Sequence, residues 1–111
     1  RLFLTAVNEG KLTLDQLVRI TSYNPARIFG IHPRKGVLQV GSDADLVVVD
    51  MDKEETISNA TTYTRVGWTP YDGQRVKGVP THTIVRGKIV MQDGDVIGEP
   101  GYGEFITPVK R

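Results

Sequence analysis

The sequence contains no cysteine and only two histidines among its 111 residues. Without cysteine the chain can form no disulfide framework, no thiolate metal site and no thiol nucleophile. No apolar run approaches the ~20 residues of a membrane span, and the residues from Arg1 onward lack the small-residue cleavage site of a secretory signal. We therefore expect a cytoplasmic protein that is not attached to a membrane.

Neither sign of charge dominates, because 14 lysines and arginines face 13 aspartates and glutamates for a net charge of +1. This balance argues against a dedicated nucleic-acid or membrane surface. Five basic residues lie among aromatic residues and glycines in the second half of the chain, and we interpret them as a solvated face: Arg65, Arg75, Lys77, Arg86 and Lys88. A chain of this mass has enough surface to bury for one core and not for two.

The first residues predict the end of a helix. Leu2, Ala6 and the run from Asn8 fit its last two turns, with Gly10 at the left-handed position that ends many helices. No capping residue precedes Leu2. We therefore expect the chain to be a piece of a larger protein.

A second helix is predicted from residue 14, because Thr13 and Gln16 have the spacing of a capping box. One apolar stripe follows at helical spacing: Leu14, Leu17, Val18 and Thr21. We expect this helix to end before Asn24-Pro25, since proline disfavours helical backbone in the residue before it. Asn24 would then cap a short helix over 26–29 that ends at Gly30.

After Gly36 the pattern changes to that of strands. The β-branched run 46–49 predicts a strand buried on both faces. Residues 81–91 predict a hairpin with its turn at Gly87-Lys88, and Asp93-Gly94 predicts a second turn into residues 96–97. The glycine- and proline-containing tail 98–111 is expected to be extended and either to dock on something else or to fray.

This order of helices followed by four or five short strands predicts an α+β layout. The helices alone cannot cover their apolar stripe, and one small sheet leaves its edges open. Both features favour a part of something larger.

Acidic residues gather around the predicted strand 46–49: Asp43, Asp45, Asp50, Asp52, Glu54 and Glu55. The apolar run interrupts the spacing that a calcium-binding loop requires. We interpret these acids as solvated residues at the ends of the strand. Asp45 is expected in addition to brace the turn through backbone N–H groups.

His32 and His82 lie fifty positions apart, in a loop and on a strand, whereas a zinc or iron site needs several ligands close together. No serine has the strand-turn-helix context of a hydrolase nucleophile, and the glycines of the tail open no helix that could bind phosphate. The sequence therefore predicts no catalytic, cofactor-binding or metal-ligating residue in this chain. The aromatic turn Trp68–Tyr71 is interpreted as filling a gap between domains, with stacking on a ligand as the alternative.

Several stretches resemble a known family. Residues 24–30 (NPARIFG), 35–38 (KGVL) and 41–50 (GSDADLVVVD) are similar to the carboxyl-terminal region of amidohydrolases. Residues 67–73 (GWTPYDG) and 83–90 (TIVRGKIV) resemble its cyclic branch, which comprises dihydroorotase, allantoinase and hydantoinase or dihydropyrimidinase.

The resemblance implies a parent protein with a metal-dependent (β/α)₈ barrel and a small β-sandwich made from both chain ends. Residues 1–34 would be the last helices packed on the barrel, residues 35–97 the sandwich strands and residues 98–111 a carboxyl-terminal tail. In this family one or two metal ions, usually zinc, activate the water that attacks a cyclic amide. The family's His-x-His pair and other ligands are missing from this sequence, so zinc is implied for the parent and no cofactor for this chain.

Our leading hypothesis is the structural carboxyl-terminal portion of a dihydroorotase, which interconverts carbamoyl aspartate and dihydroorotate in pyrimidine biosynthesis. Its partners would be the amino-terminal barrel portion of the same protein and further copies in a homo-oligomer. Allantoinase and hydantoinase or dihydropyrimidinase are the alternatives within the family. Two alternatives have no catalysis: an amidohydrolase-like scaffold, and a free-standing β domain that binds a ligand at Trp68–Tyr71.

Overall fold

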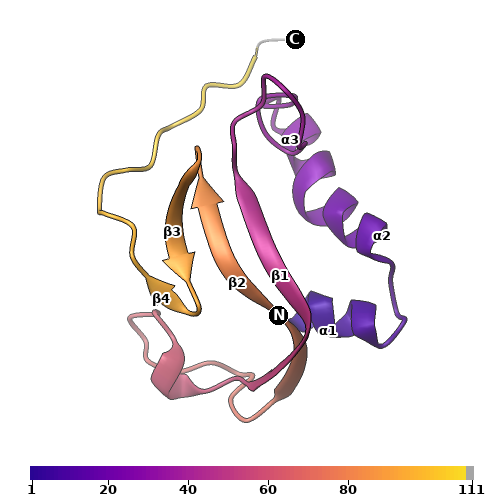
Figure 1. Cartoon of the computed structure of the whole chain (residues 1–111), viewed down its shortest axis with the longest axis vertical. Helices are drawn as coiled ribbons and strands as arrows, with labels where there is room; N and C mark the ends of the chain where they lie inside the picture. The colour runs from indigo at the N-terminus through magenta and orange to yellow at the C-terminus, as the bar shows by residue number, and fades with distance from the viewer. Residues whose placement is uncertain (110–111) are drawn as a thin grey trace.

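The computed structural model describes residues 1–109. Short helices precede one four-stranded antiparallel sheet with strand order β1-β2-β3-β4 (Figure 1). The helical elements are α1 (Leu2–Asn8), α2 (Leu14–Val18), the π-helix η1 (Arg19–Tyr23), α3 (Asn24–Ile28) and the 3₁₀ turn η2 (Asn59–Thr61). The strands are β1 (Leu46–Thr56), β2 (Arg75–Val85), β3 (Lys88–Gln92) and β4 (Asp95–Val96). The predicted α+β order is confirmed.

Helix α1 ends as its sequence predicts. Gly10 has φ +72°, and its N–H donates to the Val7 carbonyl at 3.0 Å. The Lys11 N–H donates to the Ala6 carbonyl at 2.9 Å, which completes the six-residue closing motif of a helix. A glycine is needed at this position because side chains with a Cβ atom rarely adopt positive φ.

The capping box at α2 is confirmed: the Gln16 N–H donates to Thr13 Oγ1 at 3.1 Å, and the Thr13 N–H donates to Gln16 Oε1 at 2.8 Å. The predicted break before Asn24 is wrong. Asn24 has helical φ −64° and ψ −46° and makes no capping bond. The elements α2, η1 and α3 therefore form one continuous helical segment, which we call the helical arm. The wider π turn directly before Pro25 accommodates a ring and a missing N–H that a regular α-helix would not tolerate.

Strand β1 begins where the sequence predicts but differs in length and in burial. It continues to Thr56, so the acids at 50, 52, 54 and 55 lie within the strand and not beyond its end. Val47 and Val48 are 58% and 49% exposed, because neither face of β1 is fully covered by the described residues. The prediction of a strand buried on both faces is therefore wrong for the described residues.

The β2–β3 hairpin turns one residue earlier than expected. Arg86 (φ +45°) and Gly87 (φ +80°) are its two central residues, both at the positive φ that a type I′ turn requires. The second turn lies at Asp93-Gly94 as predicted, and β4 covers 95–96 in place of 96–97. The first half of β2, residues 75–80, was not predicted.

Helix α1 packs directly on β2, and Gly78 makes the close approach. Its φ is +99°, and a Cβ atom there would lie 2.8 Å from the Cβ of Leu4. The Asn8 amide donates to the Lys77 carbonyl at 2.9 Å, and the Lys77 N–H donates to the Thr5 hydroxyl at 3.0 Å. The small core gathers around this contact and along the helical arm: Leu4, Leu17, Ala26, Val76 and Val79.

Among residues 1–109, no helix has the length and apolar character that crossing a membrane requires.

Candidate functional site

A wide apolar groove separates the helical arm from one face of the sheet. Its volume is about 970 Å³, many times the ≈ 30 Å³ that one water molecule occupies in the liquid. From the helical arm, the whole predicted apolar stripe lines the groove, together with two further residues: Leu14, Leu17, Val18, Thr21, Pro25 and Phe29. From the sheet, the lining residues belong to β1 and β2: Leu46, Val47, Val49, Met51, Pro80 and Ile84. Only one member of the stripe, Leu17, is buried, whereas Leu14 and Phe29 are 52% and 67% exposed.

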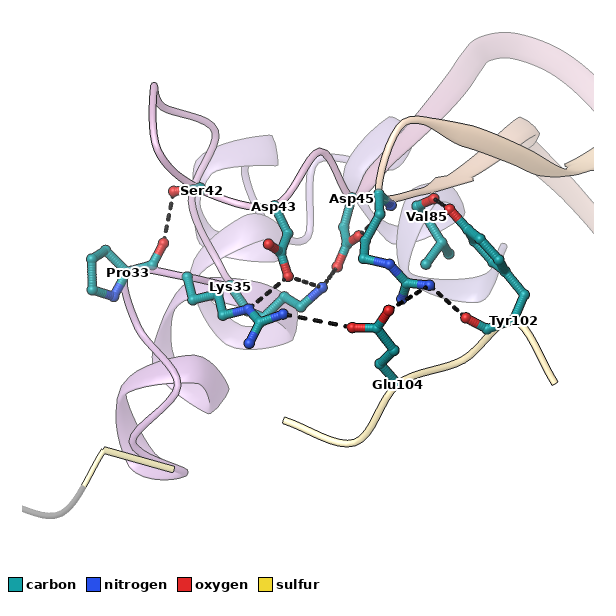
Figure 2. Close-up of polar contacts among 10 residues, drawn as sticks. Pro33, Lys35, Ser42, Asp43, Asp45, Val85, Tyr102 and Glu104 are labelled. Atoms are coloured by element: carbon teal, nitrogen blue, oxygen red, sulfur yellow. Dashed lines mark hydrogen bonds and ion pairs between the residues drawn. The ribbon is translucent and has the colours of Figure 1, made fainter. Parts of the chain in front are cut away.

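A charged cluster, made of Lys35, Asp43 and Asp45, forms part of the lining of the groove. Figure 2 shows the contacts among the three side chains. The Lys35 ammonium, whose side chain is only 18% exposed, donates to both carboxylates and lies 2.8 Å from Asp43 Oδ2. Asp45 Oδ1 accepts the backbone N–H of Arg86 at 2.9 Å. The cluster thus fixes the loop before β1 to the turn of the β2–β3 hairpin. Asp45 does accept a backbone N–H as predicted, but the N–H belongs to the hairpin turn and not to the turn before its own strand.

The cluster stabilises the charged form of each of its members. The hydrogen bond from Lys35 lowers the pKa of Asp43 below its ordinary 3.8, with help from Arg34. Burial would raise the pKa of Asp45, but Lys35 and the Arg86 N–H outweigh it and lower that pKa as well. Burial would lower the pKa of Lys35, yet the two carboxylates raise it above 10.5. A set that stays ionised at neutral pH suits bracing and is poorly matched to proton transfer.

The tail docks on the chain itself. The Tyr102 hydroxyl donates to the Val85 carbonyl at 3.0 Å, and its ring lies 4.3 Å from the Arg86 guanidinium. The guanidinium also donates to the Tyr102 carbonyl (Figure 2). Further along, the Val109 N–H donates to the Gly30 carbonyl at 2.9 Å. The structure shows residues 98–109 docked on this chain itself, so docking on something else stays a prediction, and residues 110–111 lie outside the described part.

The aromatic turn is exposed on a braced loop. Trp68 and Tyr71 are 58% and 46% exposed. Asn59 Oδ1 accepts the Thr69 N–H at 2.7 Å, and Asp72 Oδ1 accepts the Asn59 N–H at 2.7 Å, so side chains hold both ends of the turn. Whether the aromatic rings fill a gap between domains or stack on a ligand stays a prediction.

A model of the amidohydrolase family matches residues 1–90. The chain belongs to the amidohydrolase family. The L-hydantoinase of Paenarthrobacter aurescens is 44% identical over 101 residues, which cover 91% of this chain and 22% of that protein. The dihydroorotase of Pyrococcus horikoshii is 52% identical over 99 residues, which cover 89% of this chain and 23% of that protein.

A solved L-hydantoinase (dihydropyrimidinase) structure from Arthrobacter aurescens matches with a TM-score of 0.91 at 44% identity, over 94% of this chain and 23% of that one. The resemblance to cyclic amidohydrolases is thus confirmed. This amidohydrolase chain spans less than a quarter of the length of these relatives.

The two histidines of this amidohydrolase chain have separate local partners. The His32 ring meets the Tyr23 ring edge-on at 5.3 Å between centroids, after α3. His82 lies in β2, where its Nδ1 is 3.0 Å from the Thr81 hydroxyl. Among the described residues no group of three or more histidines, aspartates or glutamates is arranged to hold a metal ion. Residues 1–109 therefore do not fit the metal centre that the family resemblance implies.

Proposed function

We propose that this chain is the carboxyl-terminal structural portion of a metal-dependent cyclic amide hydrolase whose catalytic residues lie elsewhere in the same polypeptide. The names of its relatives support the reaction class, and their greater length supports a longer parent protein. The observation that carries the structural role is the open apolar groove between the helical arm and the sheet.

The exposed surface is too large for a self-sufficient domain. A folded monomer of 12.3 kDa is expected to expose roughly 6,100 Å², whereas this chain exposes 8117 Å². Its radius of gyration is 15.5 Å, against about 13 Å for a compact domain of this length. Covered by a partner, an excess of about 2,000 Å² on one side corresponds to an interface of about 4,000 Å² in total, within the range of obligate complexes.

The partner that we propose for this surface is the amino-terminal portion of the parent. In this assignment residues 1–34 pack on the (β/α)₈ barrel, and residues 35–97 contribute strands to a sandwich that the amino-terminal end completes. The exposed valines of β1, at 47 and 48, point to opposite faces of an edge strand and would be covered on both sides. A homo-oligomer and a cytoplasmic location complete the proposal.

Two substrates are favoured by specific observations. The 52% identity to a dihydroorotase supports our sequence-based preference for dihydroorotate and carbamoyl aspartate. The 44% identity and TM-score of 0.91 to L-hydantoinase support hydantoins with similar weight. Substrate choice would be made by parts of the parent outside this chain.

The test is an activity assay on the polypeptide at the length at which its source makes it. We expect ring opening of dihydroorotate or of a hydantoin, loss of that activity on exhaustive chelation and recovery on adding Zn²⁺. A polypeptide of parental length that opens neither ring at any metal loading would favour the non-catalytic scaffold. A mature product of only 12.3 kDa would overturn the proposal.

A further inference from the structure

The carboxyl-terminal tail is attached to two elements that are far apart in the chain. One attachment, at Tyr102, is on the β2–β3 hairpin turn, and the other, at Val109, is on the residue that ends α3. Figure 1 shows the tail running from β4 along the β3 side of the sheet and ending beside α3. We propose that residues 98–109 act as a strap that fixes the helical arm relative to the sheet.

The attachment at Tyr102 uses several different contacts. Its hydroxyl donates to Val85, its carbonyl accepts from the Arg86 guanidinium, and its ring lies under two cations. The guanidinium carbon of Arg86 is 4.3 Å and the ammonium of Lys88 is 5.1 Å from the ring centroid. Such contacts hold a side chain by hydrogen bonding and by cation–π attraction together. The hydroxyl, the ring and the backbone carbonyl of Tyr102 therefore all take part in this anchor.

The attachment at Val109 takes advantage of the way α3 ends. Gly30 has φ +69°, which turns its carbonyl away from the helix and lets it accept the Val109 N–H at 2.9 Å. A Cβ atom on Gly30 would lie 3.5 Å from the Cβ of Pro108, so the tail is in van der Waals contact with this turn. The second anchor is thus a backbone contact at the far end of the helical arm.

Between the anchors, one carboxylate adds charged contacts with the rest of the chain. Glu104 lies 3.5 Å from the Arg86 guanidinium and 3.9 Å from that of Arg34 (Figure 2). Phe105, next in the chain, is 91% exposed. A short span held at both ends raises the effective concentration of each anchor for its partner. Loss of one anchor should therefore loosen the other.

The strap matters because the helical arm otherwise meets the sheet through α1 and through the loop before β1. The strap contacts the lining of the groove at Val85, whose carbonyl accepts the Tyr102 hydroxyl. Holding α3 in this way sets the distance between the helical arm and the sheet, and so the width of the groove. This inference does not depend on the proposed catalysis, because it concerns contacts within residues 1–109 alone.

The test is residue-resolved hydrogen exchange on the polypeptide at the length made in its source. Tyr102→Ala should speed exchange of the Val109 amide about tenfold, the factor expected when a hydrogen bond and a cation–π contact are lost. Tyr102→Phe keeps the ring and loses the hydroxyl, so it should give a smaller rise, about threefold. The matched control is Phe105→Ala, in the same span but without an anchor, which should leave Val109 unchanged.

A truncation after Gly101 completes the test. It should speed exchange at the amides of Phe29 and Gly30, which close α3, about threefold to tenfold. If Tyr102→Ala unfolds the protein, Tyr102→Phe and the truncation still decide the matter. The proposal is overturned if the truncation leaves the α3 amides at their original rate, or if Phe105→Ala loosens Val109 as much as the Tyr102 variants do.

Discussion

At Asp45 a single carboxylate joins two separate segments, because one oxygen accepts the Arg86 N–H and the other pairs with Lys35. Asp45→Ala should lower the free energy of unfolding of the full-length protein by about 1 kcal/mol, the usual net worth of such a contact. Asp45→Asn retains an oxygen for Arg86 and should cost less than Asp45→Ala. Urea unfolding of the three proteins measures both differences.

Asp52→Ala is the matched control for these variants, because the Asp52 side chain is 98% exposed and lies 4.0 Å from its nearest cation. Its effect should be within about 0.5 kcal/mol of zero. Activity per folded molecule should be unchanged in Asp45→Ala. A large loss of turnover at unchanged stability would mean that Asp45 belongs to the active site and not to the brace.

The charged cluster also predicts how stability depends on pH. The pKa values of Asp43 and Asp45 are lowered in the folded chain, so above pH 3.8 both carboxylates make their full contribution to the free energy of unfolding. This contribution is lost as the pH falls through the lowered pKa values. Because the pKa of Lys35 is raised in the folded chain, its contribution to the free energy of unfolding is lost as the pH rises above 10.5. Lys35→Met should therefore flatten the acid limb of the stability profile. Lys53→Met removes a partly exposed pair with Glu55 at 3.5 Å, outside the charged cluster, and should leave the acid limb as steep as before.

At the scale of elements, the loop before β1 is packed on the helical arm through Gly36. A Cβ atom there would lie 2.4 Å from the Cβ of Ala26 and 2.7 Å from the carbonyl oxygen of Ser22, and φ is +82°. Gly36→Ala should therefore combine backbone strain with overpacking and cost about 3 kcal/mol or more. Thermal and urea unfolding of the full-length protein provide the measurement.

Gly41→Ala is the matched control, because Gly41 lies in the same loop at φ +91° with open space around its missing Cβ. It should show only the cost of positive φ, about 1–2 kcal/mol. The difference between the two variants then reports the packing of the loop on the helices. Equal costs would show that the loop does not hold the arm.

Local sequence signals predicted the elements that depend on local physics. The capping box at Thr13 and the turn at Asp93-Gly94 follow from contacts within a few residues, and both are confirmed. The first half of β2 was missed because its Gly78 and Pro80 obscure strand propensity. Opposite charges on the two strands were the signal that could have revealed it: Glu54 is opposite Lys77 in the register and pairs diagonally with Arg75 at 2.6 Å.

The candidate site was harder to predict because its parts are distant in sequence. The bracing role of Asp45 followed from its position before a strand, but its partner Arg86 lies 41 residues away. The docking of Tyr102 depends on the position of the hairpin turn. The turn predicted from the sequence was one residue too late. The burial expected for strand 46–49 is not reached among the described residues, because Val47 and Val48 remain 58% and 49% exposed on the two faces of β1.

At the scale of the whole molecule, the 111 residues expose about 2,000 Å² more than a compact monomer of this mass. Expressed alone, the chain should therefore associate or remain loosely packed, with high dye binding and a broad unfolding transition. Co-expression with the remaining part of the parent should give a soluble complex with a sharp transition, since the groove and the faces of β1 would then be covered. Light scattering and calorimetry on both preparations distinguish the two states. A monodisperse, cooperatively unfolding monomer of the isolated chain would contradict the structural role that we propose, because it would show that the apolar groove needs no partner.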